Sequence, residues 1–221
     1  MAFGQIMKLK TTAGLQIELA PFTREEAVVF VKGFERHSIS RYVTGRVQTK
    51  ETEEEWYDSM IKDQTSRIWG IWVVENGQRR LIGNSSLTHI STAHIRQAVS
   101  GSIIIDKSYW GKGIASACHK ARTYFAFEQL GLHRIKSAVL QPNGGSRKAL
   151  ERSGYTYVYT ERNEKFIDGG LVHMDCLECL NPVDWAWRQW WGDDRPPLKN
   201  LQARKKTAAV LAWARENVEL A

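Results

Sequence analysis

Hydrophobic and polar positions follow first a strand-like and then a helix-like period near the start of the chain. The stretch "LQIELAPFT" (15–23) alternates apolar and polar residues before a proline, which predicts an opening strand. Thr23 and Glu26 form a capping-box pattern, and the apolar run that follows them predicts a helix. A second helix is expected over 50–63, where Thr52 can cap an acidic first turn.

The middle of the chain is rich in predicted strands. Two β-rich runs within 67–90 flank Asn76 and Gly77, and an Asn-Gly pair in this setting is the strongest short hairpin signal. "IRQAVSGSIIID" (95–106) predicts another strand. "IASACHKARTYFAFEQLG" (114–131) spaces its apolar residues as a helix does and ends on glycine, a natural C-cap. We therefore expect a hairpin followed by a strand-to-helix unit.

The same alternation continues toward residue 180. A strand is expected over 133–140 and a short helix over 145–155. Two final strands, "YTYVYTE" and "LVHMDCLECL", lie on either side of the turn signal "DGG" (168–170). The core is therefore predicted to be one mixed unit of helices and strands over about 10–180, with no internal repeat.

The composition changes after Pro182. "DWAWRQWWGDDRPP" carries four tryptophans: Trp185, Trp187, Trp190 and Trp191. The stretch 198–221 predicts an amphipathic helix with basic residues at 204–206. We interpret 1–182 as one domain and 183–221 as a Trp-rich linker and helical extension. This extension can bury aromatic area on the domain or on a second subunit, close over a cleft, or offer RNA a basic aromatic surface.

Composition narrows the class of protein. The 221 residues are 43% hydrophobic and 25% charged, as in an ordinary globular protein with one sizeable core. No apolar run approaches the roughly 20 residues of a membrane span, and the N-terminus lacks the pattern of a secretory signal. Three cysteines cannot form a paired disulfide framework, so we expect a cytoplasmic protein. The net charge of +7 favours an anionic partner; it leaves nucleic acid open and does not select it.

The first candidate site is the glycine loop in "YWGKGIASACHKA" (109–121), between a predicted strand and a predicted helix. Gly111 and Gly113 let backbone N–H groups converge, the helix N-terminus adds a positive dipole end, and Lys112 adds a charge. This pattern favours an anion nest suited to a pyrophosphate, with a plain strand-to-helix turn as the alternative. Neither the P-loop nor the GxGxxG dinucleotide motif is present.

The second candidate site follows the next strand, in "QPNGGSRKALERSGY". Asn143 stands at a strand end, where its side-chain amide can bond an extended amide-bearing ligand. Ser146 stands at a helix start, where it either caps the helix or presents its hydroxyl to a leaving group.

A zinc pattern also occurs in the sequence, and we do not adopt it. His173, Cys176 and Cys179 read H-x-x-C-x-x-C, but residues three apart on a strand point to opposite faces. The second half of a tetrahedral site is missing. No metal is expected.

Taken together, residues 15–180 resemble the GNAT superfamily of acyl-CoA-dependent N-acetyltransferases. "WGKGIA" (110–115) matches that family's [QR]-x-x-G-x-[GA] pyrophosphate motif, with Trp110 in place of the usual Gln or Arg. The wider run "SGSIIIDKSYWGKGIA…LQPNGGSRKALERSGY" resembles the RimJ/RimL-like branch, which acetylates N-termini of ribosomal proteins. The resemblance implies an α+β fold with a mixed, mostly antiparallel sheet flanked by helices.

The resemblance also implies roles for individual residues. Asn143 would contact the pantetheine of acetyl-CoA, and Ser146 would position or protonate the departing thiolate. Backbone groups for the pantetheine would come from Ile103, Ile104 and Ile105. The pyrophosphate would be wrapped by Trp110, Gly111, Lys112, Gly113, Ile114 and Ala115.

The general base is not assigned by the resemblance. Relatives often carry a glutamate where this chain has Val99, and a tyrosine where it has Leu150. Substitutes for the base are His89, His94 and His173, each of which also fits an ordinary surface histidine.

The activity implied is direct transfer of an acetyl group from acetyl-CoA, as co-substrate, to a primary amine. Protein N-terminal α-amines come first as acceptors and small-molecule amines second. Two alternatives stay open: a GNAT fold that binds CoA without turnover, and an acetyltransferase associated with RNA or the ribosome. A homodimer is also left open.

Overall fold

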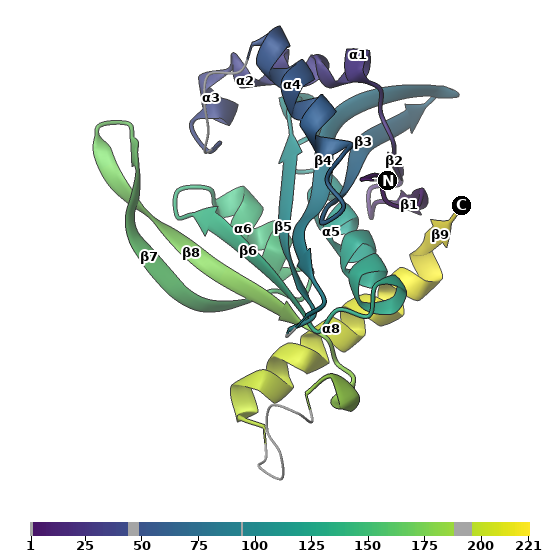
Figure 1. Ribbon diagram of the computed structural model, residues 1–221, viewed down its shortest axis with the longest axis vertical. Coiled ribbons are helices and arrows are strands. Elements are labelled where there is room, and N and C mark those ends of the chain that lie inside the picture. Colours follow the sequence, from purple (N-terminus) through teal and green to yellow (C-terminus); the bar gives the residue numbers. More distant parts are fainter. Residues whose placement is uncertain (1, 44–48, 94, 188–195) are drawn as a thin grey trace.

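The computed structural model describes residues 2–43, 49–93, 95–187 and 196–221. A nine-stranded sheet in the order β7-β8-β6-β5-β4-β3-β2-β1-β9 forms its centre (Figure 1). The strands are β1 (Met7–Lys10), β2 (Gln16–Ala20), β3 (Arg67–Glu75), β4 (Gln78–Ser91), β5 (Gln97–Ile104), β6 (Arg134–Leu140), β7 (Thr156–Ile167), β8 (Gly170–Leu180) and β9 (Val218–Leu220). The expected mixed, mostly antiparallel sheet is confirmed.

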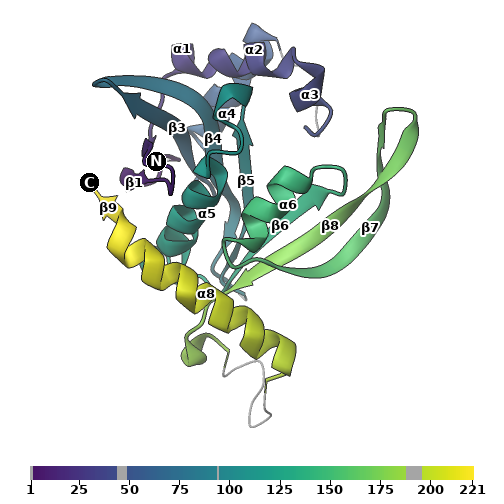
Figure 2. The same ribbon diagram turned by 180° about the vertical axis from the view of Figure 1, so that it is seen from behind.

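Helices cover both faces of the sheet (Figures 1 and 2). They are α1 (Arg24–Ala27), α2 (Val29–Phe34), α3 (His37–Ser40), α4 (Lys50–Met60), α5 (Ile114–Tyr124), α6 (Gly144–Glu151) and α8 (Leu198–Asn217), with the short turns η1 (Lys107–Tyr109), η2 (Phe125–Gln129) and η3 (Asp184–Ala186). One hydrophobic cluster joins α1, α2 and α4 to β3 and β4, and a second, larger one lies beneath α5 and α8. Burial of these two apolar layers provides the main driving force for folding.

The parallel pair β5–β6 is the exception in the sheet. Its register runs only from Gln97 opposite Arg134 to Val99 opposite Lys136. Beyond Val99, β5 stays paired with β4 as far as Ile104, while β6 stays paired with β8 as far as Leu140. The sheet is therefore continuous at one end of these two strands and divided at the other.

Both predicted hairpin turns are confirmed. Asn76 and Gly77 have φ of 52° and 74°, and Asp168 and Gly169 have φ of 50° and 84°. Two successive residues with positive φ are typical of a type I′ turn, whose twist matches that of the flanking strands. The β3–β4 and β7–β8 registers close at these two turns.

Several helix boundaries differ from those expected. The Thr23–Glu26 capping box is confirmed, but α4 is capped by Thr49, whose hydroxyl accepts from Thr52 N at 3.2 Å. The helix expected over 114–131 is α-helical only to Tyr124 and then widens into the π-helical turn η2. Thr52 is thus the reciprocal partner of the cap rather than the cap itself.

The C-terminal helix is shorter than expected and ends in a strand that the sequence pattern does not signal. Residues after α8 form β9, which pairs antiparallel with β1, a strand that the pattern also missed. Arg204 of α8 is buried and makes an ion pair with Asp184 while donating to the Pro182 carbonyl. These contacts attach the C-terminal segment to the sheet, and the division at residue 182 stays a prediction.

The tryptophans of this segment lie on both sides of the described boundary. The Trp187 ring is buried and its Nε1 donates to Asn181 O at 2.7 Å, whereas Trp185 is exposed and stacks edge-on against the His133 ring. Trp190 and Trp191 lie outside the described residues. Among the helices that the structure does describe, none combines the length and apolar character needed to cross a membrane.

Helix α4 contains a buried carboxyl group. Glu53 is only 4% exposed, and no hydrogen bond or ion pair of its side chain is formed within the described ranges. Its burial raises the pKa of this carboxyl from 4.5 to about 7. The acidic stretch of α4 is therefore not uniformly a solvated face.

Replacing Gly154 by alanine is expected to destabilise the fold more than the same change at Gly169. Both have positive φ, which costs a non-glycine residue about 1–2 kcal/mol. At Gly154 the new Cβ would also lie 3.3 Å from Thr207 Cα of α8, whereas it would meet nothing within 4 Å at Gly169. Chemical denaturation of the two variants measures the difference, and equal losses would contradict the contact with α8.

Substituting Glu53 by glutamine is expected to raise stability at pH 8 by roughly 1–3 kcal/mol and to change it little at pH 5. The folded pKa lies above the unfolded one, so the folded state holds the extra proton between about pH 4.5 and 7, and stability falls as the pH rises through that window. Denaturation at both pH values checks this, with the exposed Glu55→Gln as the control. Equal stability of Glu53→Gln and wild type at pH 8 would contradict it.

Candidate active site

The division between β5 and β6 leaves backbone groups of β5 without a strand neighbour. Ile105 N donates to Ile82 O at 2.8 Å, so odd-numbered residues of this strand turn their N–H and C=O groups toward β4. Even-numbered residues turn theirs toward β6, as the hydrogen bond of 3.4 Å from Ser137 Oγ to Ser100 O illustrates. Past Val99 the pairing with β6 has ended, and the groups of Ser102 and the N–H of Ile104 face the opening.

The three isoleucines expected to lend backbone groups are therefore not equivalent. Ile103 faces β4, and a Cβ on Gly83 would lie 2.0 Å from its carbonyl oxygen. The amide of Ile105 is already bonded to β4. Ile104 alone of the three turns toward the opening, and Ser102 joins it there. Strand alternation could have identified Ser102 once the register was known.

The glycine loop follows directly on this strand. Gly111 and Gly113 have φ of 74° and 80°, and Gly113 is the left-handed N-cap of α5. No acceptor for the backbone N–H groups of 111–116 is present in the described part of the chain. A run of free amides at a helix N-terminus forms an anion nest.

Trp110 fixes this loop to the strand end. Its indole Nε1 donates to Ile104 O at 3.0 Å, and the side chain remains 43% exposed. Lys112 Nζ lies 5.1 Å from the ring centroid of Tyr109, whose hydroxyl donates to Glu75 Oε2 at 2.8 Å. These contacts hold the loop against the end of β5, while its glycines and Lys112 face solvent.

The second predicted site lies at the same edge of the sheet, because β5 and β6 are parallel and both loops follow their carboxyl ends. Asn143 caps α6: its Oδ1 accepts from Ser146 N at 3.2 Å. The interpretation of Ser146 as the cap is therefore wrong. Its half-buried hydroxyl makes no hydrogen bond to any described residue, and it is free to serve a ligand.

The segment around α3 closes the top of the opening. Asp168, at the tip of the β7–β8 hairpin, accepts from His37 Nε2 at 3.2 Å and pairs with Arg41 Nη1 at 2.9 Å. The Tyr42 hydroxyl donates to Pro142 O, in the turn between β6 and α6. Figures 1 and 2 show α3 reaching across from α2 toward the hairpin. The opening is thereby bounded on three sides.

Small polar residues line the β4–β5 surface on the side of α1–α4. Asn84, Ser86 and Thr88 of β4 lie opposite Ile103, Gly101 and Val99 of β5. Ile103 packs against the cluster under α2 and α4, which identifies the face. Serine, threonine and glycine leave room for a second substrate beside the exposed edge of β5.

The candidate histidines do not identify a base. His89 has φ of 50° and its Nδ1 lies 3.1 Å from Thr88 Oγ1. His173 Nδ1 accepts from Asn163 N at 3.1 Å, in the β7–β8 hairpin. His94 lies outside the described residues. At Val99 the chain has no ionisable side chain, so the role of base stays unassigned.

The zinc pattern is split between two faces of β8. Cys179 is buried with its Sγ 3.4 Å from Thr207 Oγ1 of α8, and its burial raises the pKa of the thiol to about 12. Cys176 points to the other face, next to Tyr159. Over the described ranges, no three His, Cys, Asp or Glu side chains are placed to hold a metal ion.

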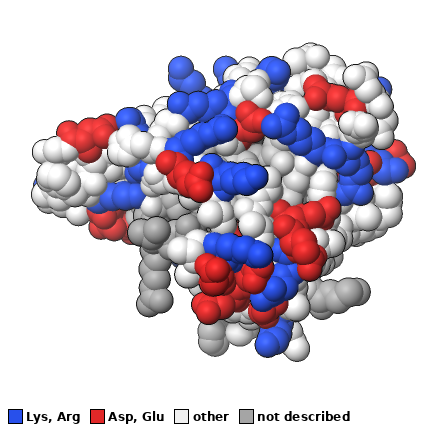
Figure 3. All heavy atoms as spheres, turned by 90° about the horizontal axis from the view of Figure 1, so that it is seen from above, with Lys and Arg blue, Asp and Glu red and all other residues white. Residues whose placement is uncertain are grey.

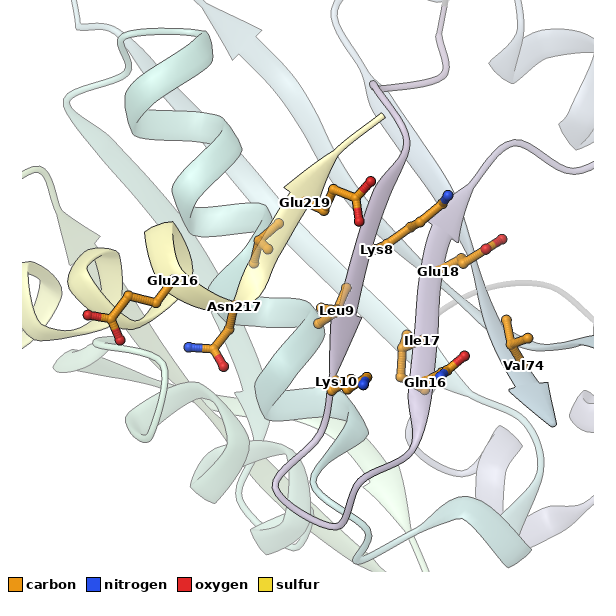
Figure 4. A pocket seen from close by; sticks show the side chains of 11 residues that line it. Lys8, Leu9, Lys10, Gln16, Ile17, Glu18, Val74, Glu216, Asn217 and Glu219 are labelled. Carbon is orange, nitrogen blue, oxygen red and sulfur yellow. The ribbon is translucent and has the colours of Figure 1, made fainter.

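Two cavities of about 490 Å³ lie away from the glycine loop. One is lined by polar and apolar residues of β1, β2, β9 and the end of α8, among them Lys8, Glu18 and Glu219 (Figure 4). The other lies between the end of β2, α1 and α4.

Viewed from above, lysine and arginine side chains are interspersed with carboxylates rather than joined into one basic surface (Figure 3). The backbone geometry at the β5–β6 division is therefore the stronger indication of a site.

Comparisons with known proteins find relatives of this chain. The family model described as an acetyltransferase (GNAT) domain matches residues 16–156. A curated relative, the "Probable N-acetyltransferase YjcK" of Bacillus subtilis (strain 168), is 32% identical over 154 residues, covering 68% of this chain and 82% of that protein.

Two solved structures share the fold. RimJ of Mycobacterium smegmatis, in complex with CoA-disulfide, has a TM-score of 0.67 and 16% identity, covering 98% of this chain and 97% of that one. Spermidine N-acetyltransferase of Vibrio cholerae, in complex with CoA and spermine, has a TM-score of 0.66 and 24% identity, covering 74% and 95%. The match to RimJ extends over the C-terminal segment, which the family model leaves out.

Proposed function

The chain belongs to the GNAT acetyltransferase family, and from this premise we propose that it transfers the acetyl group of acetyl-CoA to a protein N-terminal α-amine. The observation that carries the proposal is the division of β5 from β6 beside the glycine loop. That arrangement offers an extended ligand a row of backbone groups ending at an anion nest. Acetyl-CoA has the matching parts, an amide-rich pantetheine arm and a pyrophosphate.

In the proposed function, acetyl-CoA lies along β5 with its pyrophosphate at the glycine loop. The amides of Gly111, Lys112, Gly113, Ile114 and Ala115 take the pyrophosphate, and the Lys112 ammonium adds to their charge. The pantetheine runs along β5 past Ile104 and Ser102, in the position that a neighbouring strand would take. Asn143 keeps its side-chain NH₂ for the pantetheine while its oxygen caps α6.

The reaction needs no covalent enzyme intermediate. The neutral amine nitrogen bonds to the thioester carbon, the carbonyl electron pair moves to oxygen, and the C–S bond then breaks with its pair on sulfur. Ser146 donates its hydroxyl proton to that thiolate and regains a proton from solvent, or it holds the water that protonates the thiolate. The proton on the acetylated nitrogen leaves to solvent. Holding both substrates side by side supplies much of the rate.

The acceptor class rests on the open surface of small polar residues on β4 and β5. An extended peptide N-terminus fits beside Asn84, Ser86 and Thr88, and the likeness to RimJ over most of the chain supports this class. Small polyamines are the second candidate, because the Vibrio cholerae structure holds spermine as well as CoA. The alternatives of a CoA-binding protein without turnover and of a ribosome-associated enzyme are decided by the same assays.

Release of free thiol from acetyl-CoA is expected with peptides bearing a free N-terminus, and not with the same peptides after N-terminal blocking.

Gly111→Glu is expected to abolish CoA binding, measured by calorimetry, because its carboxylate faces the pyrophosphate. Gly111→Asn is the matched control, since asparagine tolerates positive φ without adding charge. CoA binding with no turnover on peptides or polyamines would favour the non-catalytic alternative, and a salt-sensitive shift with ribosomes would favour the ribosome-associated one.

Ser146→Ala is expected to lower kcat by about 10- to 100-fold while changing the Kd for CoA by less than about 3-fold. The hydroxyl has no structural partner in the described chain, so its loss leaves the α6 cap intact. Ser59→Ala, at an exposed position of α4, serves as the control. A kcat equal to that of wild type would assign Ser146 no part in the chemistry.

A further inference from the structure

A buried positive charge lies beneath the opening in the sheet. Arg122, on the inner face of α5, is 0% exposed. Its Nη1 donates to Gly101 O at 2.6 Å and to Ser85 Oγ at 2.9 Å, and its Nη2 lies 2.6 Å from His119 Nδ1. No carboxylate of the described residues forms an ion pair with it.

The groups around Arg122 are all neutral. Burial and the nearby guanidinium lower the pKa of His119 well below its ordinary value, so its Nδ1 is an acceptor. Burial raises the pKa of the Cys118 thiol to about 12, and the Tyr155 hydroxyl donates to Ser100 Oγ at 3.1 Å. The charge of Arg122 is therefore uncompensated by any neighbour that titrates.

An unpaired charge at a core position costs free energy of folding. Removing an ion from water costs several kcal/mol even after the protein relaxes, and buried charges are normally paired. An apolar side chain would pack between α5 and the sheet without that cost. A buried guanidinium that faces the backbone of the candidate site therefore calls for an explanation in terms of that site.

The geometry connects Arg122 to the opening through one peptide group. The C=O of Gly101 and the N–H of Ser102 belong to the same peptide, and they point in opposite directions across β5. The carbonyl faces β4 and accepts from Arg122, while the N–H faces the opening beyond the end of the β5–β6 pairing. Donation to the oxygen of an amide polarises it and makes its N–H a stronger donor.

We propose that Arg122 is a positioning residue that, through the Gly101–Ser102 peptide, strengthens the Ser102 N–H as a donor to the thioester carbonyl oxygen of acetyl-CoA. This inference rests on the proposed function. As the amine nitrogen bonds to the carbonyl carbon, negative charge collects on that oxygen, and a preorganised donor stabilises it. The oxygen returns its electron pair as the C–S bond breaks and sulfur leaves.

Gly101 suits this arrangement because it adds no side chain over the peptide. A Cβ at this position would lie 3.0 Å from Ser86 Oγ on the acceptor side. The charge of Arg122 therefore acts on the opening through a single peptide group.

The proposed hydrogen bond from the Ser102 N–H polarises the thioester C=O bond of acetyl-CoA, and infrared spectroscopy measures that bond. The infrared carbonyl band of [1-¹³C]acetyl-CoA, bound without acceptor, is compared with that of the free thioester. We expect a shift to lower wavenumber in the wild-type protein, a band near the free value in Arg122→Met, and an intermediate one in Arg122→Gln, whose amide can donate without charge. We expect kcat to fall by about 10- to 100-fold in Arg122→Met, with a Kd for CoA within about 3-fold of wild type.

Cys118→Ala is the matched control, because it removes a fully buried side chain of the same helix and no group that touches Gly101. It is expected to lower stability while keeping the wild-type band and kcat. A wild-type band and kcat in Arg122→Met would overturn the inference, and if that variant does not fold, Arg122→Gln decides in the same way. Wild-type protein that binds acetyl-CoA with an unshifted band overturns the role of Arg122 alone, whereas failure to bind acetyl-CoA overturns the proposed function with it.

Discussion

The short pairing between β5 and β6 is the constraint on which the rest of the site depends. A parallel pair held over only three positions, Gln97–Val99 with Arg134–Lys136, forces the two halves of the sheet apart beyond it. Each half is stabilised independently, β5 by β4 and β6 by β8, so the division costs only the hydrogen bonds of a few residues. In the proposed function, acetyl-CoA supplies those bonds in place of a strand and recovers that cost.

Parallel orientation also brings the two loops to one edge. If β5 and β6 ran antiparallel, the glycine loop and the Asn143 turn would lie at opposite ends of the pair. The loop is held by Trp110, whose indole bonds the last carbonyl of β5, and the turn is held by the Asn143 cap. The same contacts that terminate the strands therefore fix the position of the glycine loop relative to the Asn143 turn.

Local patterns in the sequence predicted the local features well. The hairpin at Asn76–Gly77 and the capping box at Thr23 follow from backbone preferences of a few adjacent residues, and both are confirmed. The family was also evident, because the strand before the glycine loop, the loop itself and the Asn143–Ser146 turn agree with it in order and spacing. What could not be predicted depends on register: that Ile105 turns inward while Ser102 faces the opening, and that the last residues pair with β1 as β9. A three-residue strand has too little pattern of its own to be distinguished from a helix end.

The burial of the Arg122 charge could not be predicted from the sequence either. In the sequence it is one cation among 31 lysines and arginines, next to the helical stripe of α5, where a charged residue normally reaches solvent. The structure places it under Gly101 because α5 packs across β4 and β5, and neither its burial nor its lack of a carboxylate is visible without that packing. The net charge of +7 therefore includes at least one charge that no external partner can contact. For this chain, the positions of individual cations around the divided sheet indicate function better than the net charge does.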